Sequence, residues 1–324
     1  MIILSSMKWR KKGLIFNPTE HKLPGNCKEY AQSPQAVVFD DFVRIYFSTR
    51  ERDNIGKYLS HVSFVDYDLS FSKILGVSNK VVIQLGDLGC FDEHGIFPFS
   101  VYKDVDLILA YTTGWNRKVS VSADASIGLA ISTNGGLNFQ KYGKGPILTS
   151  SLHEPFLVGD GFVLKINSTY HMWYIFGTEW VNFNESDEPE RVYKIAHATS
   201  VDRINWIREG RKIISDKIND YECQALPTVV EHNGIYHMFF CFRNAQGFRT
   251  DREKSYRIGY AYSTDLVNWT RDDERGAPQT TLGSWDSDMM CYPFVFKCNG
   301  NIYLLYNGNE FGRYGFGIAE LEGN

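Results

Sequence analysis

Residues 226–242 decide the fold: Leu226-Pro227-Thr228-Val229-Val230 is followed by Asn233-Gly234 and then by Tyr236-His237-Met238-Phe239-Phe240-Cys241-Phe242. Asn-Gly is the dipeptide that tight hairpin turns prefer, because both residues tolerate a left-handed backbone. The flanking runs are rich in β-branched and aromatic residues, which is typical of buried strands. The segment therefore predicts a β-hairpin with two buried strands.

The same hairpin pattern occurs five times in the chain, and repeats of this length are typical of propellers and solenoids. The first strands, each beside a proline, span 33–38, 97–101, 154–158, 226–230 and 292–296. The second strands span 43–49, 107–113, 170–178, 236–242 and 302–307. A third strand is predicted at 127–132, 194–200, 257–263 and 315–319, and in three repeats an aromatic residue then opens a fourth.

These repeats predict an all-β fold, a five-bladed β-propeller formed by residues 1–324 as a single domain. The blades are expected at about 29–85, 92–148, 153–215, 222–275 and 286–320, the last one completed by 7–16. Few residues follow the third strand of the last repeat, so its edge would stay unpaired. Residues 9–16 match the fourth-strand pattern of 206–213, and we expect this N-terminal strand to close the ring.

The composition indicates which partners to expect. A formal net charge of −4 gives no basic surface for nucleic acid or an anionic membrane. No apolar stretch approaches the roughly 20 residues that span a bilayer, and Met1-Ile2-Ile3-Leu4 lacks the basic start of a signal peptide. Six cysteines without CxxC spacing fit reduced thiols. We therefore expect a cytoplasmic protein without a membrane span. Aromatic residues reach 15%, which suits stacking on sugar rings as well as packing between sheets.

Acidic residues precede the first strands. In a propeller, the starts of the first strands and the ends of the second strands meet at one mouth of the ring. Four acids lie five residues before a proline, one directly precedes Pro155, and two more lie close by: Glu29, Glu93, Glu222, Asp288, Glu154, Asp92 and Asp286. One such acid can simply cap a turn, but several around one funnel repel each other and shift each other's pKa values. The pattern predicts a functional ring of carboxylates.

The ends of the second strands carry further candidates for substrate binding: Arg50, Trp115, Glu179, Trp180 and Arg243, with Tyr292 and Asp286 beside them. The arginines either form structural ion pairs or hold a carboxylate or phosphate of the ligand by a bidentate contact. The tryptophans are either core residues or platforms for a sugar ring.

Other chemistries have no sequence signal. His94 and His153 lie at the predicted rim without neighbours at metal-ligand spacing, so no metal site is expected. There is no glycine-rich phosphate loop before a helix and no nucleophilic serine motif. We expect no cofactor.

Several segments resemble a known group of propellers: 172–174, 195–200, 257–261, 283–288 and 305–309. Over nearly its whole length the chain is similar to the five-bladed propellers shared by arabinanases and xylosidases, invertases and levansucrases, and mannoside phosphorylases. It looks most like a branch that resembles the propeller domain of glucosamine inositolphosphorylceramide transferases, whose bacterial members are linked with surface-polysaccharide synthesis. The resemblance implies a protein that acts on a glycosidic or nucleotide-sugar bond.

The hydrolases of this group carry a base or nucleophile in blade one, a supporting Asp in blade two and an acid Glu in blade three. Glu154 fits the blade-three acid by location. Gln32-Ser33-Pro34 stands where those enzymes have an Asp near the proline, which is a departure from their pattern. Glu222-Cys223 resembles the Glu-Cys of invertases but falls in blade four.

The sequence therefore predicts a carbohydrate-active, glycoside hydrolase-like protein with a sugar or sugar conjugate as substrate. Two opposed carboxyl groups would cleave or transfer a glycosyl group, one protonated as acid and one ionised as base or nucleophile. Glu222 and Glu154 are the acid candidates, and Glu93, Asp92 and Asp288 are candidates for the ionised partner. Two alternatives stay open: a sugar-nucleotide-dependent glycosyltransferase or its companion domain, with phosphate on the arginines, and a sugar-binding propeller without catalysis.

Overall fold

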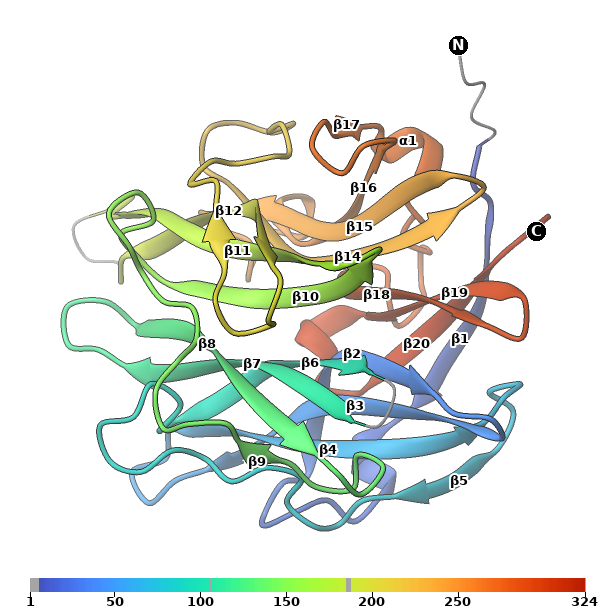
Figure 1. The fold of residues 1–324 in the computed structure, drawn as a ribbon, viewed down its shortest axis with the longest axis horizontal. Helices are drawn as coiled ribbons and strands as arrows, with labels where there is room; N and C mark the ends of the chain where they lie inside the picture. Colours follow the sequence, from blue (N-terminus) through green and yellow to red (C-terminus); the bar gives the residue numbers. More distant parts are fainter. Residues whose placement is uncertain (1–5, 105–106, 185–187, 324) are drawn as a thin grey trace.

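The computed structural model describes residues 6–104, 107–184 and 188–323. Their regular secondary structure is almost entirely strand, as predicted (Figure 1). The strands are β1 (Trp9–Phe16), β2 (Glu29–Val38), β3 (Phe42–Arg52), β4 (Tyr58–Asp68), β5 (Ile74–Val77), β6 (Gly95–Lys103), β7 (Ile108–Arg117), β8 (Ala123–Ser132), β9 (Gln140–Lys141), β10 (Val158–Ile166), β11 (Thr169–Val181), β12 (Glu190–Ser200), β13 (Ile207–Arg208), β14 (Glu222–His232), β15 (Ile235–Asn244), β16 (Arg257–Ser263), β17 (Thr270–Arg271), β18 (Cys291–Cys298), β19 (Asn301–Asn307) and β20 (Phe316–Leu321). The helical segments are short: η1 (Pro18–Glu20), η2 (Arg252–Lys254), α1 (Asp273–Gly276) and η3 (Asn309–Gly312).

The strands form repeated antiparallel units. Three sheets have four strands each, in the orders β10-β11-β12-β13, β14-β15-β16-β17 and β18-β19-β20-β1. The remaining sheet runs from β2 to β9, but a single parallel pair, Ser60 with Gly95, joins its halves β2–β5 and β6–β9. We number these five arrays units 1 to 5 in chain order, beginning with β2–β5, and call β2, β6, β10, β14 and β18 the inner strands.

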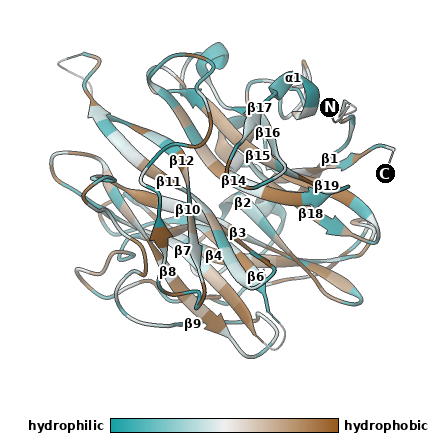
Figure 2. Cartoon of the chain, turned by 45° about the horizontal axis from the view of Figure 1, so that its top comes forward, coloured by the Kyte–Doolittle hydropathy of each residue, from teal (hydrophilic) through white to brown (hydrophobic). Residues whose placement is uncertain are grey.

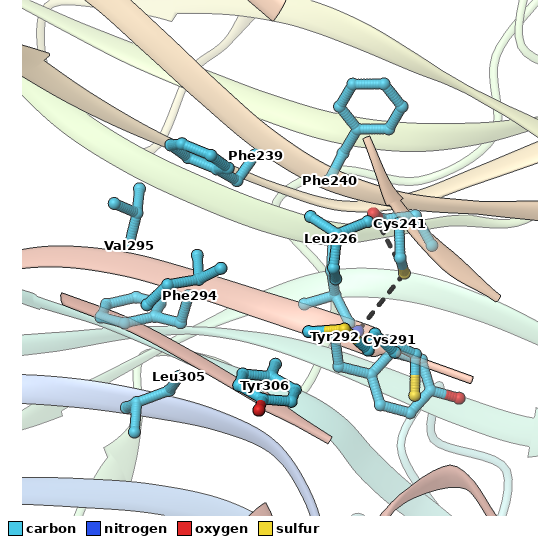
Figure 3. Close-up of a cluster of buried hydrophobic side chains, with 14 of the residues drawn as sticks. Leu226, Phe239, Phe240, Cys241, Cys291, Tyr292, Phe294, Val295, Leu305 and Tyr306 are labelled. Atoms are coloured by element: carbon cyan, nitrogen blue, oxygen red, sulfur yellow. Dashed lines mark hydrogen bonds between the residues drawn. The ribbon is translucent and has the colours of Figure 1, made fainter. Parts of the chain in front are cut away.

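The inner strands contact one another in succession, and β18 also contacts β2 (Figure 1). On four of them a residue with left-handed backbone interrupts the ladder and donates its N–H to a side chain of the preceding unit. The acceptors are Asn307 Oδ1 for Ser33, Thr113 Oγ1 for Asp160, Asp160 Oδ2 for Leu226 and Cys241 Sγ for Tyr292, at 2.8, 2.7, 3.1 and 3.4 Å. Figure 3 shows the Cys241 thiol between Tyr292 and the strand of unit 4. These bonds fix each inner strand against its predecessor.

The N-terminal strand β1 is the edge strand of unit 5. It runs antiparallel to β20, with Trp9 opposite Leu321 and Phe16 opposite Phe316, so residues 9–16 pair with the last repeat (Figure 1). The indole Nε1 of Trp9 also donates to the carbonyl of Gly276 at 2.8 Å. This pairing covers the edge that the last repeat would otherwise leave unpaired.

The predicted first strand of the third repeat is misplaced. The sequence suggested 154–158, beside Pro155, but the inner strand β10 spans Val158–Ile166. Glu154 instead forms an isolated bridge with Ser151 ahead of the strand. The left-handed position that Ser33, Leu226 and Tyr292 occupy just before a proline is held here by Asp160, before a glycine. The proline was therefore a misleading marker in this repeat.

The turns and the core agree with the sequence pattern. Asn233 and Gly234 both have positive φ, at 53° and 75°, as the predicted Asn-Gly hairpin requires. Apolar residues concentrate along the strands and polar ones at the loops (Figure 2). Aromatic side chains such as Trp173, Tyr174 and Phe239 are fully buried between units. This rigid packing holds the ends of the inner strands in place.

Candidate active site

Four of the predicted carboxylates are buried in ion pairs within their own units. Each is at most 1% exposed, and its partner is a cation on the outermost strand of the same unit. The pairs are Asp92 with Lys141 (2.5 Å), Glu154 with Arg208 (2.7 Å), Glu222 with Arg271 (2.6 Å) and Asp286 with Lys11 (2.6 Å). The repeated geometry ties the start of each inner strand to the edge of its sheet.

Additional hydrogen bonds hold two of these carboxylates, Glu222 and Glu154. Glu222 accepts from the backbone N–H groups of Lys217 and Ile218, at 2.9 and 3.0 Å, and from Gln224 Nε2 at 2.9 Å. Tyr174 donates to Glu154 at 2.5 Å, and burial together with that carboxylate raises the pKa of Tyr174. A buried carboxylate with this many donors stabilises the fold.

The predicted ring of carboxylates around one cavity is not what the structure shows, because Asp92, Glu154, Glu222 and Asp286 lie outside the lining of the central cavity described below. The sequence does not show these pairs, because each acid meets its cation only after the outer strand has folded back across the unit.

The other predicted acids are also elsewhere. Glu29 pairs with Arg313 at 3.0 Å, and Glu93 accepts from the backbone N–H of Gly89 at 2.9 Å. Asp288 is exposed and lines a neighbouring hollow, and Glu179 is exposed at the end of β11. Trp180 is half-buried against the main core and does not line the central cavity.

A cavity of about 430 Å³ lies among the inner strands, lined by residues of all five units. Four of the predicted substrate-binding residues line it: Arg50, Trp115, Arg243 and Tyr292. The cavity also holds side chains that the sequence did not single out as site residues, which include Asp160, Arg191, Asp124, Tyr30, Tyr58, Tyr193 and Tyr256. Its volume is in the range of pockets that take small ligands.

Asp160 is the buried carboxyl group of this cavity, 8% exposed, on the left-handed residue of β10. Its Oδ2 accepts from Leu226 N–H at 3.1 Å. Burial raises the pKa of Asp160 to about 7, although the Leu226 N–H and the charge of Arg191 oppose the shift. A carboxyl group with such a pKa can hold a proton near neutral pH and give it to a leaving group.

Arg50 enters the cavity among aromatic rings. Its guanidinium lies 5.1 Å from the ring centroid of Tyr30, 5.6 Å from Tyr58 and 5.9 Å from Phe97. Its Nε is buried without a hydrogen-bond partner. Burial lowers the pKa of Arg50, and the nearby charge of Arg191 lowers it further.

Arg243, only 1% exposed, is held more firmly. Its guanidinium stacks on Phe248, 3.5 Å from the ring centroid. Nη1 donates to the carbonyl of Asn244 at 2.8 Å, and Nε donates to the hydroxyl of Tyr256 at 3.2 Å. The stacking and these bonds fix the direction in which the group faces.

The remaining wall is aromatic. Trp115 stacks against His94 at 6.0 Å between ring centroids, and Tyr292 packs edge-on against Phe97 at 5.2 Å. The hydroxyl groups of Tyr193 and Tyr256 lie 2.8 Å apart. Rings that also carry hydroxyl groups suit a ligand such as a sugar, which has both apolar faces and hydrogen-bonding groups.

One sequence signal could have found Asp160. In Val158-Gly159-Asp160-Gly161 the Asp occupies the position of Ser33, Leu226 and Tyr292 in the other repeats, so alignment by the left-handed residue instead of the proline identifies it. No comparable signal marks Arg191, which lies at the start of a third strand.

Metal and disulfide chemistry have no geometric counterpart in the described part of the chain. Residues 6–104, 107–184 and 188–323 contain no group of three or more His, Cys, Asp or Glu side chains arranged to hold a metal ion. All six cysteines are free thiols. Within the same ranges no helix has the length and apolar character to cross a bilayer.

Comparison with known proteins identifies the family. No protein-family model matches the chain. It is 34% identical over 317 residues to the uncharacterized protein Rv1502 of Mycobacterium tuberculosis, which covers 98% of this chain and 100% of that protein. The chain therefore belongs to the same protein family as Rv1502. It is also 27% identical over 117 residues to a 1,2-beta-oligomannan phosphorylase of Thermoanaerobacter, about a third of each chain.

Solved structures with the same fold are glycoside hydrolases and their relatives. One glycoside hydrolase superposes with a TM-score of 0.73 at 17% identity, covering 98% of this chain and 92% of its own. A structure from the GH130 family of mannoside phosphorylases and hydrolases gives 0.68 at 15% identity, covering 99% and 95%. A thermostable family-43 glycoside hydrolase gives 0.64 at 12%, covering 93% and 95%. At these identities the likeness shows the fold, which is that of the propeller glycoside hydrolases.

Proposed function

We propose that this protein is a carbohydrate-active enzyme that cleaves or transfers a glycosyl group in the central cavity of a five-bladed, single-domain propeller. Five antiparallel units with successive inner-strand contacts support the blade count, and the pairing of β1 with β20 supports closure of the ring. The single observation that carries the proposal is a buried carboxyl group, Asp160, in a cavity walled by aromatic rings.

Asp160 is the acid of the proposed reaction. Its carboxyl O–H gives a proton to the glycosidic oxygen while the C1–O bond breaks, and an oxygen of the acceptor forms the new bond to C1. A neutral acceptor loses its proton to solvent or to Asp124, whereas an anionic acceptor has no proton to lose. The proton lost by Asp160 is restored from solvent.

This assignment replaces the pair of carboxylates expected from the sequence. Glu222 and Glu154 are fully buried, accept hydrogen bonds from cations, tyrosine or backbone donors, and do not line the central cavity. Asp124, which lines the cavity and pairs with Lys118 at 3.3 Å, is the other carboxylate within reach of a ligand there.

The comparisons support carbohydrate as substrate. The 1,2-beta-oligomannan phosphorylase and the GH130 proteins that target β-1,2 mannosidic linkages make short mannosides the first substrates to try. The branch resembling inositolphosphorylceramide transferases, a role in surface-polysaccharide metabolism and a cytoplasmic location stay predictions from the sequence.

The test is product analysis by mass spectrometry. The protein is incubated with aryl glycosides, β-1,2-mannobiose, and nucleotide sugars with acceptors, each with and without phosphate. We expect turnover of at least one substrate, reduced at least about 100-fold in Asp160→Asn and kept in the control Asp41→Asn, which alters an exposed acid. Turnover that is undiminished in Asp160→Asn would overturn the assignment. Binding of a sugar without any turnover would indicate a non-catalytic propeller.

A further inference from the structure

The central cavity contains more positive charge than its own residues neutralise. Four arginines line it: Arg50 from unit 1, Arg191 from unit 3, and Arg243 and Arg249 from unit 4. No carboxylate in the described part of the chain lies within ion-pairing distance of Arg50, Arg191 or Arg243.

The other charged groups of the cavity do have partners. Arg249 pairs with Glu190, and Asp124 pairs with Lys118. One carboxylate oxygen of Asp160 already accepts a hydrogen bond from the Leu226 N–H. Because its pKa is raised to about 7, this group carries only part of a negative charge near neutral pH. One such group cannot balance three guanidinium charges.

The donors of these arginines are also largely unused. Arg50 makes no hydrogen bond and its buried Nε has no acceptor. Arg191 donates only from Nη1, to Ser122 Oγ at 3.2 Å. Arg243 donates hydrogen bonds from Nη1 and Nε to neighbouring groups of unit 4, and its Nη2 makes no hydrogen bond within the described part of the chain. Burying the Arg50 Nε without an acceptor is costly, and this cost is offset when a ligand supplies the acceptor.

We propose that Arg50, Arg191 and Arg243 form a binding site for a phosphoryl group. A phosphoryl group has three or four oxygens and up to two negative charges. It can therefore accept hydrogen bonds from several guanidinium groups at once, which a ligand with a single carboxylate cannot do. Stacking of Arg50 and Arg243 on aromatic rings keeps both charges in place before the ligand arrives. Because Asp160 lines the same cavity, the phosphoryl group lies next to the acid.

This inference rests on the proposed function and names its substrate class. The phosphoryl group comes from one of two sources: inorganic phosphate as the glycosyl acceptor, or a sugar phosphate or nucleoside diphosphate sugar as the donor. Both place an anion beside the sugar. Inorganic phosphate as acceptor has no proton to lose, whereas with a phosphorylated donor the phosphate leaves with the electrons of the C1–O bond and the neutral acceptor passes its proton to Asp124 or solvent.

The experiment is isothermal titration calorimetry of the full chain with inorganic phosphate, with uridine diphosphate and with glucuronate. We expect 1:1 binding of phosphate or of the diphosphate, weaker at high salt, and little binding of glucuronate. Arg50→Gln and Arg191→Gln should each weaken binding by about tenfold or more, since a charge-assisted hydrogen bond contributes roughly 1.5–3 kcal/mol. Tighter binding of inorganic phosphate would indicate that phosphate is the glycosyl acceptor. Tighter binding of uridine diphosphate would indicate that a nucleoside diphosphate sugar is the glycosyl donor.

Two controls separate the possible failures. Arg211→Gln alters an arginine that pairs with Glu209 on the surface, and it should leave anion affinity unchanged. Asp160→Asn should keep anion binding while it loses turnover, so the failure of the anion site and the failure of the proposed acid are distinguishable. No binding of either phosphate compound at about 10 mM, or unchanged affinity in both arginine variants, overturns the proposal.

Discussion

Two sets of buried charges in this molecule differ in one respect. At the unit edges, Asp92, Glu154, Glu222 and Asp286 each meet a cation of their own unit within 2.7 Å. In the central cavity, Arg50, Arg191 and Arg243 meet no carboxylate partner, and Asp160 has its pKa raised to about 7. Charges that are matched within the chain stabilise it, whereas unmatched charges at a cavity are available to a ligand.

The largest effect should come from removing the cavity acid. Asp160→Asn keeps the acceptor for Leu226 N–H but cannot donate a carboxyl proton, so we expect turnover to fall by about 10²–10⁴-fold. Steady-state kinetics on the substrate found by product analysis checks this. An unchanged kcat in this variant would mean that Asp160 has a structural role only, like the paired acids at the unit edges.

A comparable effect, on stability instead of turnover, should come from a matched acid. Glu222→Ala removes the acceptor of two backbone N–H groups and leaves Arg271 with Asp273 as its carboxylate partner, so we expect the free energy of unfolding to fall by about 3–5 kcal/mol. Urea denaturation measures the difference. Glu253→Ala is the control, because that side chain is 75% exposed. If both variants are equally stable, the edge pairs do not stabilise the fold.

The pH dependence of stability should separate the two sets further. The folded pKa of Asp160, about 7, lies above its ordinary value of 3.8, so the folded state binds the proton more tightly. This contribution to stability is complete below about pH 4 and is lost as the pH rises to about 7, up to roughly 4 kcal/mol in all. Denaturation midpoints at pH 5 and pH 8 should therefore differ less in Asp160→Asn than in the parent. Equal differences in the two proteins would contradict the raised pKa.

The smallest loss of stability is expected for the ion pair between Lys11 and Asp286, because its lysine is partly exposed. Lys11 is 20% exposed, and Lys11→Met leaves Asp286 with Tyr306 as its side-chain donor, so we expect a loss of about 1–3 kcal/mol. Thermal unfolding followed by circular dichroism measures it, with Lys80→Met on an exposed loop as control. An unaffected midpoint would mean that the attachment of β1 does not depend on this pair.

The sequence predicted most of the strands but not the buried ion pairs, for one physical reason. Hairpins such as 226–242 are specified locally, by apolar alternation and by Asn233-Gly234, so a linear reading finds them. The direction of an acidic side chain depends on contacts with distant residues. Glu222 is separated by 49 positions from the arginine that neutralises it, and no local pattern records that pairing.

The third repeat shows the same division. Pro155 follows the sequence pattern of the prolines in the other inner strands, yet β10 begins only at Val158. As a result Asp160, and not Glu154, lines the cavity. Arg50, Trp115, Arg243 and Tyr292 were predicted as substrate-binding residues because they lie at strand ends, and they do line the cavity.

By itself the sequence determined the repeat, the all-β secondary structure and the N-terminal strand that resembles a missing fourth strand. Each of these depends on local patterns among residues that are close together in the chain. Only the tertiary structure decided which charges are neutralised within a unit and which stay unpaired at the centre. The reason is that charge pairing depends on distances through space, and these are set only when the separate units fold and pack against one another.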